Sequence, residues 1–127
     1  MSDILNREDI FSVVEAFYKK ALTDEVIGVY FTEVVQLNLE THIPKIVSFW
    51  EVMLFGTGDY RGNPMREHFP LNRILPMEQM HFNRWLDLWI ETIDALFEGK
   101  NATEAKTRAT HIANLMAFKM EEATKRG

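Results

Sequence analysis

The sequence predicts an all-helical fold in a single domain, residues 1–127. In four long segments, apolar residues recur at steps of three and four residues, which is the pattern of an amphipathic helix. No segment shows the alternation of apolar and polar residues that a half-buried strand needs, and glycine and proline mark the breaks between the periodic segments. With 127 residues and 46% apolar side chains, the chain has the length and composition of one domain with one core.

The first two long helices are expected over residues 8–23 and 40–55. Pro44 falls in the first turn of the second helix, where proline is tolerated, and Gly56 ends that helix. The apolar stripe of the first helix consists of Ile10, Val13, Val14, Phe17 and Ala21. One face of the second helix carries His42, Ile46, Phe49 and Met53.

Two further long helices are expected in the second half of the chain. One begins near Pro76 and ends at Gly99, and the other covers residues 102–125. The stripe of the first of these consists of Phe82, Trp85, Trp89, Ile93 and Leu96. The stripe of the last helix consists of Ala105, Ala109, Ile112, Ala113, Met116 and Met120.

A short helix over residues 64–69 is predicted between the two halves of the chain. Asn63 followed by Pro64 is a typical helix start, and Pro70 ends the helix within two turns. This short, tethered element presents His68, which suits a ligand held at a fixed distance.

Composition excludes several classes of function. With 14 basic and 19 acidic residues and no basic stripe, the chain lacks the signature of a nucleic-acid binder. No run of eighteen apolar residues predicts a membrane span, and the polar start does not resemble a signal peptide, so we expect a cytoplasmic protein. The absence of cysteine excludes disulfides, zinc–thiolate sites, iron–sulfur clusters and covalently attached haem. The high aromatic content, nine Phe, three Tyr and three Trp, indicates rings that stack together or surround a flat apolar group.

The four histidines differ in their surroundings. His111 has no acidic or histidine partner nearby in sequence and is expected to be structural. Glu78-x-x-His81 is half of a di-iron motif, but no second Glu-x-x-His exists, so this site is not favoured. His42 heads an apolar helix face, where a boundary residue is common. His68 is the best metal-ligand candidate, with an exposed loop histidine as the alternative.

Taken together, five segments resemble the truncated haemoglobins, and more narrowly their third, bacterial group. These segments are Phe17-Tyr18, Ile27-Gly28-Val29-Tyr30-Phe31, His42 to Phe49-Trp50, Gly58-Asp59-Tyr60-Arg61-Gly62-Asn63-Pro64-Met65-x-x-His68, and Phe82-x-x-Trp85-Leu86-x-Leu88-Trp89. They cover nearly the whole chain in order, and the Phe-Trp and Tyr-x-Gly-x-Pro-x-x-x-His segments are specific. The glycine pairs of the first two groups are missing, as the pattern of the third group implies.

The resemblance implies a truncated-globin fold, a two-over-two helical sandwich around non-covalent haem b. His68 matches the proximal iron ligand, and Tyr18, His42 and Trp85 match the distal positions around the bound gas. Further haem contacts are implied for Phe31, Phe49, Trp50, Leu54 and Met65, with Arg66 on the proximal side and Tyr60 or Arg61 near a propionate. His81 stands where the family has an apolar residue and receives no role.

These residues predict reversible binding of dioxygen and other diatomic gases with slow release. The phenol of Tyr18 and the indole of Trp85 are donors aimed at the negative charge on the ligand, and His42 adds a third bond or swings out as a gate. Slow release favours detoxification or redox chemistry over oxygen transport.

Two alternatives stay open from sequence. The first is a haem enzyme, a peroxidase or nitric-oxide dioxygenase, which would need an external reductase because the chain has no Gly-x-Gly-x-x-Gly segment for a nucleotide cofactor. The second is a cofactor-free helical interaction module. We expect a monomer or weak dimer.

Overall fold

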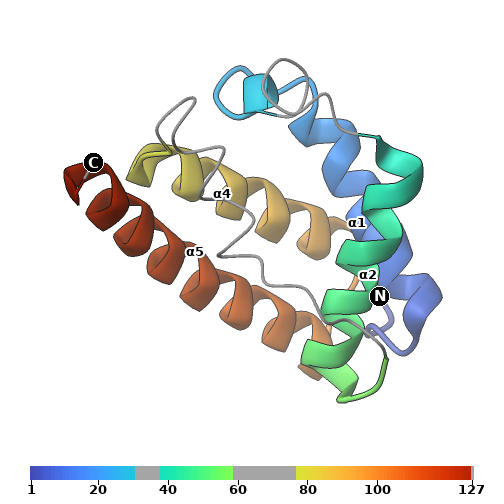
Figure 1. Ribbon diagram of the computed structural model, residues 1–127. Coiled ribbons are helices and arrows are strands. Elements are labelled where there is room, and N and C mark those ends of the chain that lie inside the picture. Colours follow the sequence, from blue (N-terminus) through green and yellow to red (C-terminus); the bar gives the residue numbers. More distant parts are fainter. Residues whose placement is uncertain (31–37, 59–76, 127) are drawn as a thin grey trace.

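The computed structural model describes residues 1–30, 38–58 and 77–126 (Figure 1). These ranges contain four long helices and no strand: α1 (Arg7–Ala21), α2 (Leu39–Phe55), α4 (Gln79–Leu96) and α5 (Lys100–Arg126). The all-helical prediction is confirmed. The short helix predicted for residues 64–69 lies outside the described residues. No helix within the described ranges is both long enough and apolar enough to cross a membrane.

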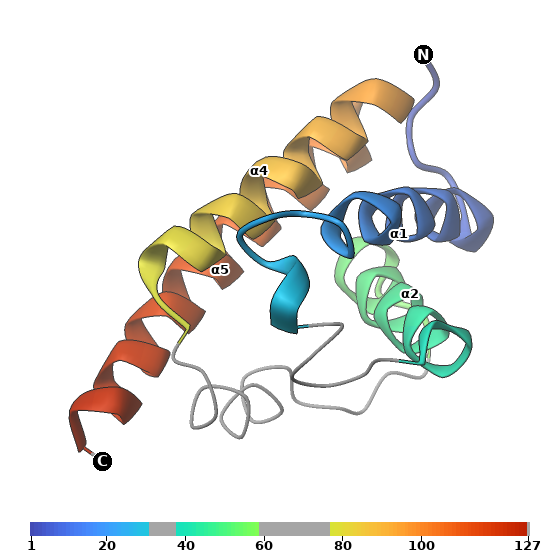
Figure 2. The same ribbon diagram turned by 90° about the horizontal axis from the view of Figure 1, so that it is seen from above.

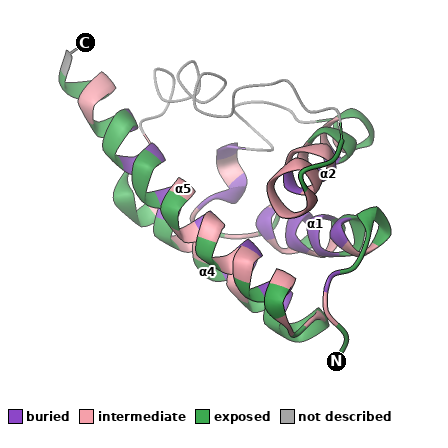
Figure 3. Cartoon of the chain, turned by 90° about the horizontal axis from the view of Figure 1, so that it is seen from below, coloured by how far each residue is buried: buried purple, intermediate pink, exposed green. Residues whose placement is uncertain are grey.

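The helices form two pairs that cross each other. Helices α4 and α5 run antiparallel along most of their length, while α1 and α2 form the other pair (Figures 1 and 2). Helix α1 packs on both α2 and α4, and much of it is buried (Figure 3). The main core therefore lies where α1, α2 and α4 meet, around Val14, Val47 and Ile93, which are completely buried.

Side-chain caps explain where the helices begin. Asn6 caps α1 by accepting a hydrogen bond from the Asp9 backbone N–H at 2.9 Å, and Asn38 caps α2 in the same way through Glu40. Gly56 ends α2 in the left-handed conformation, with φ of 69°, as its position predicts.

The prediction that the third long helix begins near Pro76 is wrong, because α4 begins at Gln79. The Glu78 side chain accepts a hydrogen bond from the backbone of His81, and the ring Nδ1 of His81 accepts one from the Glu78 backbone N–H at 2.8 Å. This reciprocal capping box fixes the first turn at that point.

The last helix begins at Lys100, two residues earlier than predicted, because the N-terminal segment caps it. The Asp3 carboxylate accepts hydrogen bonds from the backbone N–H groups of Asn101 and Ala102, both at 2.9 Å. Gly99 has φ of 146°, and a Cβ there would lie 2.5 Å from the Asp3 Cγ. Glycine is therefore needed at this close approach.

Candidate functional site

The centre of the candidate site is a contact between α1 and α2. The Tyr18 hydroxyl oxygen lies 2.6 Å from Nε2 of His42, a hydrogen-bond distance, and the two rings meet edge to face with centroids 5.3 Å apart. The contact joins two of the three predicted distal residues. His42 therefore points toward Tyr18, a direction that sequence reasoning left open.

The local sequence explains how each partner reaches this position. Tyr18 belongs to the buried face of α1 and is 6% exposed. His42 lies in the first turn of α2, where its backbone N–H donates to the carbonyl of Asn38 at 3.0 Å. The packing of α1 on α2 brings the two side chains together.

The phenol of Tyr18 is a protonated group. Burial raises the pKa of Tyr18, because a low-dielectric environment disfavours the phenolate. The hydroxyl therefore retains a proton to donate at neutral pH. When His42 carries its proton on Nδ1, the Tyr18 O–H donates to Nε2. When the proton is on Nε2, the imidazole donates to the phenol oxygen, and the phenol O–H can turn to another acceptor.

Trp85, the third predicted distal residue, lies at the edge of an aromatic cluster. Its ring is 6.1 Å from Phe17, the neighbour of Tyr18 in α1, and stacks on Trp89 with centroids 6.2 Å apart. Trp89 uses its indole N–H inside the core, donating to the carbonyl of Ala105 at 3.3 Å. Trp85 is only half-buried, and within the described ranges its N–H has no such partner. Its indole is therefore a candidate donor on α4, next to Phe17 of α1.

The predicted wall residues of α2 occupy different depths. Phe49 and Leu54 are half-buried at the edge of the core, whereas Trp50 is 2% exposed and stacks on Trp89 with centroids 4.8 Å apart. Phe49 meets Trp50 edge to face at 5.3 Å, so Trp50 supports Phe49 from inside the core. The remaining predicted residues, Phe31, Tyr60, Arg61, Met65, Arg66 and His68, lie outside the described ranges.

The structure gives Glu78-x-x-His81 a role other than metal binding. Both side chains are engaged in the capping box of α4, and the His81 ring meets the buried Tyr30 edge to face at 5.2 Å. Within residues 1–30, 38–58 and 77–126, no three His, Asp or Glu side chains gather in a way that could hold a metal ion. His111 is exposed on α5.

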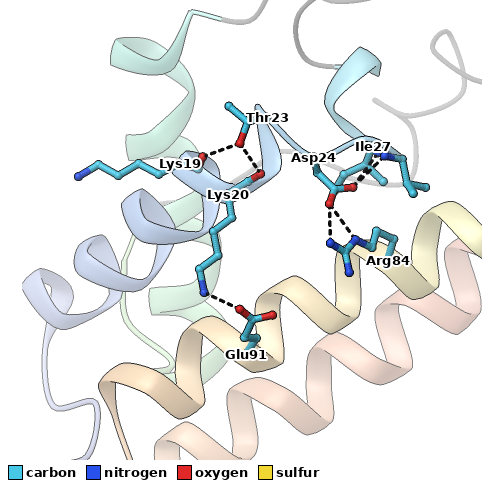
Figure 4. Close-up of polar contacts among 8 residues, drawn as sticks. Lys19, Lys20, Thr23, Asp24, Ile27, Arg84 and Glu91 are labelled. Carbon is cyan, nitrogen blue, oxygen red and sulfur yellow. Dashed lines mark hydrogen bonds and ion pairs between the residues drawn. The ribbon is translucent and has the colours of Figure 1, made fainter.

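An ion pair that sequence reasoning missed joins the segment after α1 to α4. Asp24 accepts from Nε and Nη2 of Arg84 at 2.8 and 2.7 Å, and from the backbone N–H groups of Val26 and Ile27 (Figure 4). Lys20 and Glu91 form an exposed ion pair that joins α1 itself to α4. These contacts hold α1, and Tyr18 with it, against α4. An aspartate just before a helical turn was the available local signal.

Replacing Asp24 by asparagine is expected to reduce stability by about 1–2 kcal/mol at pH 7, because charge-assisted bonds to Arg84 and two backbone N–H groups are weakened. The hydrogen bond from Arg84 holds the pKa of Asp24 below its usual value, although burial opposes this. A lowered carboxyl pKa stabilises the fold above the unfolded pKa of about 4, and this contribution disappears as pH falls through the folded pKa. The difference between wild type and Asp24→Asn should therefore shrink below about pH 4.

Urea unfolding of both proteins at neutral and acidic pH measures this difference. Asp94→Asn is the matched control, since Asp94 is 54% exposed in its ion pair with Lys106, and its effect should be small. A difference between wild type and Asp24→Asn that does not change with pH would contradict the assigned role.

Comparison with known proteins identifies relatives along almost the whole chain. Residues 3–122 match the family described as bacterial-like globin. The group 3 truncated hemoglobin ctb of Campylobacter jejuni is 33% identical over 121 residues, which cover 90% of this chain and 93% of that protein. The crystal structure of group III truncated hemoglobin from Campylobacter jejuni superposes with a TM-score of 0.82 at 29% identity, covering 94% of this chain and 95% of that one.

Proposed function

Because the chain belongs to the bacterial-like globins, and within them to the group III truncated haemoglobins, we propose that it holds haem b through His68 and releases dioxygen slowly. Membership of the globin family brings haem-based binding of a diatomic gas. The partly buried hydrogen bond between Tyr18 and His42 is the observation that supports slow release and the choice of ligand chemistry.

The described residues fit a flat, apolar cofactor with a polar gas ligand on one side. Phe49 and Leu54 of α2 and Trp85 of α4 are large apolar side chains left half-buried at the edge of the core, where a further apolar surface can cover them. The Tyr18–His42 pair supplies the polar groups. When bound, haem supplies an iron atom that accepts one ligand from the protein and one diatomic gas.

The remaining contacts of the cofactor come from residues named by the resemblance. We assign the bond to iron to His68, and contacts with the ring to Phe31 and Met65. Trp50 supports Phe49 from the core side and contacts the cofactor only through it. Since the chain has no cysteine, retention depends on the His68 bond and on apolar packing.

Tyr18, His42 and Trp85 stabilise the gas ligand by donating hydrogen bonds. The phenol O–H of Tyr18 turns from Nε2 of His42 to the ligand, or His42 orients it by donating from Nε2. The indole of Trp85 can only donate. His42 also serves as the gate, with a ring that swings away from Tyr18 when the 2.6 Å hydrogen bond between them breaks.

A site with two strong donors suits chemistry on a retained ligand better than transport. We propose detoxification or redox turnover, such as nitric-oxide dioxygenation or peroxide reduction, with electrons from a separate reductase. The donors stabilise negative charge, and such charge grows when dioxygen or peroxide is reduced.

Absorption spectra of the purified protein test this proposal. We expect a Soret band in the ferric, ferrous and carbonyl forms, a pyridine haemochrome of the b type, and dioxygen release over seconds or longer after rapid mixing. Protein that stays colourless after incubation with haem would favour the cofactor-free helical module. A red protein that releases dioxygen rapidly would retain the globin assignment and contradict the proposed role of the distal donors.

A further inference from the structure

Trp89 lies where the four long helices of the described residues meet. It belongs to α4 and is 3% exposed. From α1, Phe17 meets its ring edge to face, with centroids 5.6 Å apart. From α2, Trp50 stacks on it with centroids 4.8 Å apart. Its indole N–H donates to the carbonyl of Ala105 in α5 at 3.3 Å. One buried side chain therefore contacts all three of the other long helices.

These contacts leave the ring of Trp89 little freedom to turn. The plane of Trp50 lies within 18° of the plane of Trp89, whereas the plane of Phe17 stands at 75° to it. The hydrogen bond to Ala105 fixes the edge of the indole that carries the N–H. A close-packed ring whose one polar group is bonded is held in a single orientation. Trp89 therefore presents a fixed flat surface to its neighbours.

Trp85 packs on this flat surface. It lies one turn before Trp89, on the same face of α4. The two indole planes differ by 5° and the centroids are 6.2 Å apart, which is an offset stack. Trp85 is half-buried at the edge of the core. Because the energy of an indole changes only gradually with rotation about χ2, the plane of such a ring depends on what it packs against.

The other neighbours of Trp85 restrict its ring less. It also packs against a small second cluster that contains Met116 and Met120. Methionine side chains are flexible and adapt to the groups around them. Phe17 touches the Trp85 ring at 6.1 Å and 76°, an edge contact and not a stack. Trp89 is therefore the rigid group that lies parallel to the indole of Trp85.

We propose that Trp89 is a positioning residue for the bound gas, because it fixes the ring plane of Trp85 and so the direction of the indole N–H. This inference rests on the proposed function, in which Trp85 donates a hydrogen bond to the gas ligand. Such a bond weakens steeply as its angle falls toward 120°, so a turned indole would donate poorly. Trp89 is not itself the donor, since its N–H is bonded to Ala105.

Stopped-flow release of dioxygen from the full, haem-loaded protein tests the proposal. Trp89→Leu removes the flat surface and should speed release by about three- to tenfold, part of the loss expected when the donor itself is removed. Trp89→Phe retains a flat ring and should release dioxygen within about twofold of wild type. Carbon monoxide carries little charge, so its release should change by less than about twofold in both variants.

Ile10→Ala is the matched control for a disturbed core. Ile10 is buried in α1, two turns before Phe17, so its truncation should lower stability without removing the flat surface under Trp85. Dioxygen release in this variant should stay within about twofold of wild type. A residue that only fills the core would give the same result in Trp89→Leu.

The double variant Trp85→Phe/Trp89→Leu tests whether Trp89 acts through Trp85. Once the indole donor is gone, its direction no longer matters. The double variant should therefore release dioxygen no faster than Trp85→Phe alone. Further acceleration would show that Trp89 acts by another route, for example through Trp50 and the wall of α2.

Fluorine NMR of the ferrous carbonyl form, labelled with fluorotryptophan, observes the ring directly and does not depend on dioxygen. The chain has three tryptophans, so each resonance can be assigned by replacing one tryptophan with phenylalanine. In Trp89→Leu the Trp85 resonance should broaden or split, because the ring adopts more than one orientation. In Ile10→Ala it should stay single and sharp.

The outcomes separate this inference from the proposed function. If Trp85→Phe speeds dioxygen release but Trp89→Leu has a wild-type rate, a sharp Trp85 resonance or equal acceleration for both gases, the inference alone is wrong. If Trp85→Phe itself has a wild-type rate, the donor role of Trp85 is wrong and the inference fails with it. Circular dichroism and the Soret band of each variant verify that the chain has folded and holds haem.

Discussion

Replacing His68 by glycine is expected to remove nearly all haem from the purified protein. If His68 is the only side chain bonded to iron, its loss leaves the cofactor held by apolar packing alone, because the chain has no cysteine for covalent attachment. Added imidazole can occupy the space vacated by the side chain, so it should restore haem uptake and a Soret band close to that of wild type. Haem content per chain and the absorption spectrum measure both effects.

His111→Gly is the matched control for this experiment. His111 is exposed on α5, so the change should weaken the helix by about 0.5 kcal/mol and leave haem bound. A normal spectrum of His68→Gly without imidazole would show that His68 is not the iron ligand. The globin family assignment would survive that result, since it depends on the match along residues 3–122.

The approximate positions of the four long helices could be predicted from sequence because apolar periodicity is local, although the buried residues of α2 are Ile43, Val47 and Trp50 and not the predicted stripe. The stripe of the first helix, for example, is the buried face of α1 with all five predicted members. The start of α4 was missed because Glu78 and His81 were considered as metal ligands and dismissed, whereas the same spacing forms a capping box. The start of α5 depends on Asp3, almost a hundred residues away, which no local pattern reveals.

The contacts within the candidate site were harder to predict from sequence than the helices. From sequence, Tyr18 is the residue next to Phe17 of the first apolar stripe and His42 heads an apolar face of the second helix, but their 2.6 Å contact depends on how the two helices pack. Before the structure, only the family resemblance assigned Tyr18 and His42 to the same site. Asp24 and Arg84 are 60 positions apart in the sequence, and the family resemblance includes neither of them. Their contact was therefore not predicted.

Removing the Tyr18 hydroxyl is expected to speed dioxygen release by about ten- to hundredfold. A hydrogen bond to a charged acceptor contributes about 1.5–3 kcal/mol, and each 1.4 kcal/mol corresponds to about a factor of ten. The outer atom of bound dioxygen carries negative charge, and burial raises the pKa of Tyr18 so that its proton is available to this atom. Tyr18→Phe retains the ring and its edge-to-face contact with Phe17, at 5.3 Å, and removes only the donor.

Trp85→Phe should accelerate release by a similar factor, because it removes the other donor. If the two donors act on the same ligand atom, the double variant will show more than the product of the single effects, since in each single variant the remaining donor partly compensates for the missing one. Tyr30→Phe is the matched control, because Tyr30 is equally buried and its ring contacts His81. Its release rate should stay within about twofold of wild type.

Stopped-flow release of dioxygen into excess carbon monoxide measures wild type and these variants under one set of conditions. Tyr18→Phe also deprives His42 of its 2.6 Å partner, so the rate of carbon monoxide binding should rise if the imidazole acts as a gate. Carbon monoxide carries little charge, and its release should change far less than that of dioxygen. Equal acceleration for both gases would mean that Tyr18 fills space near the ligand, and the electrostatic account of retention would be wrong.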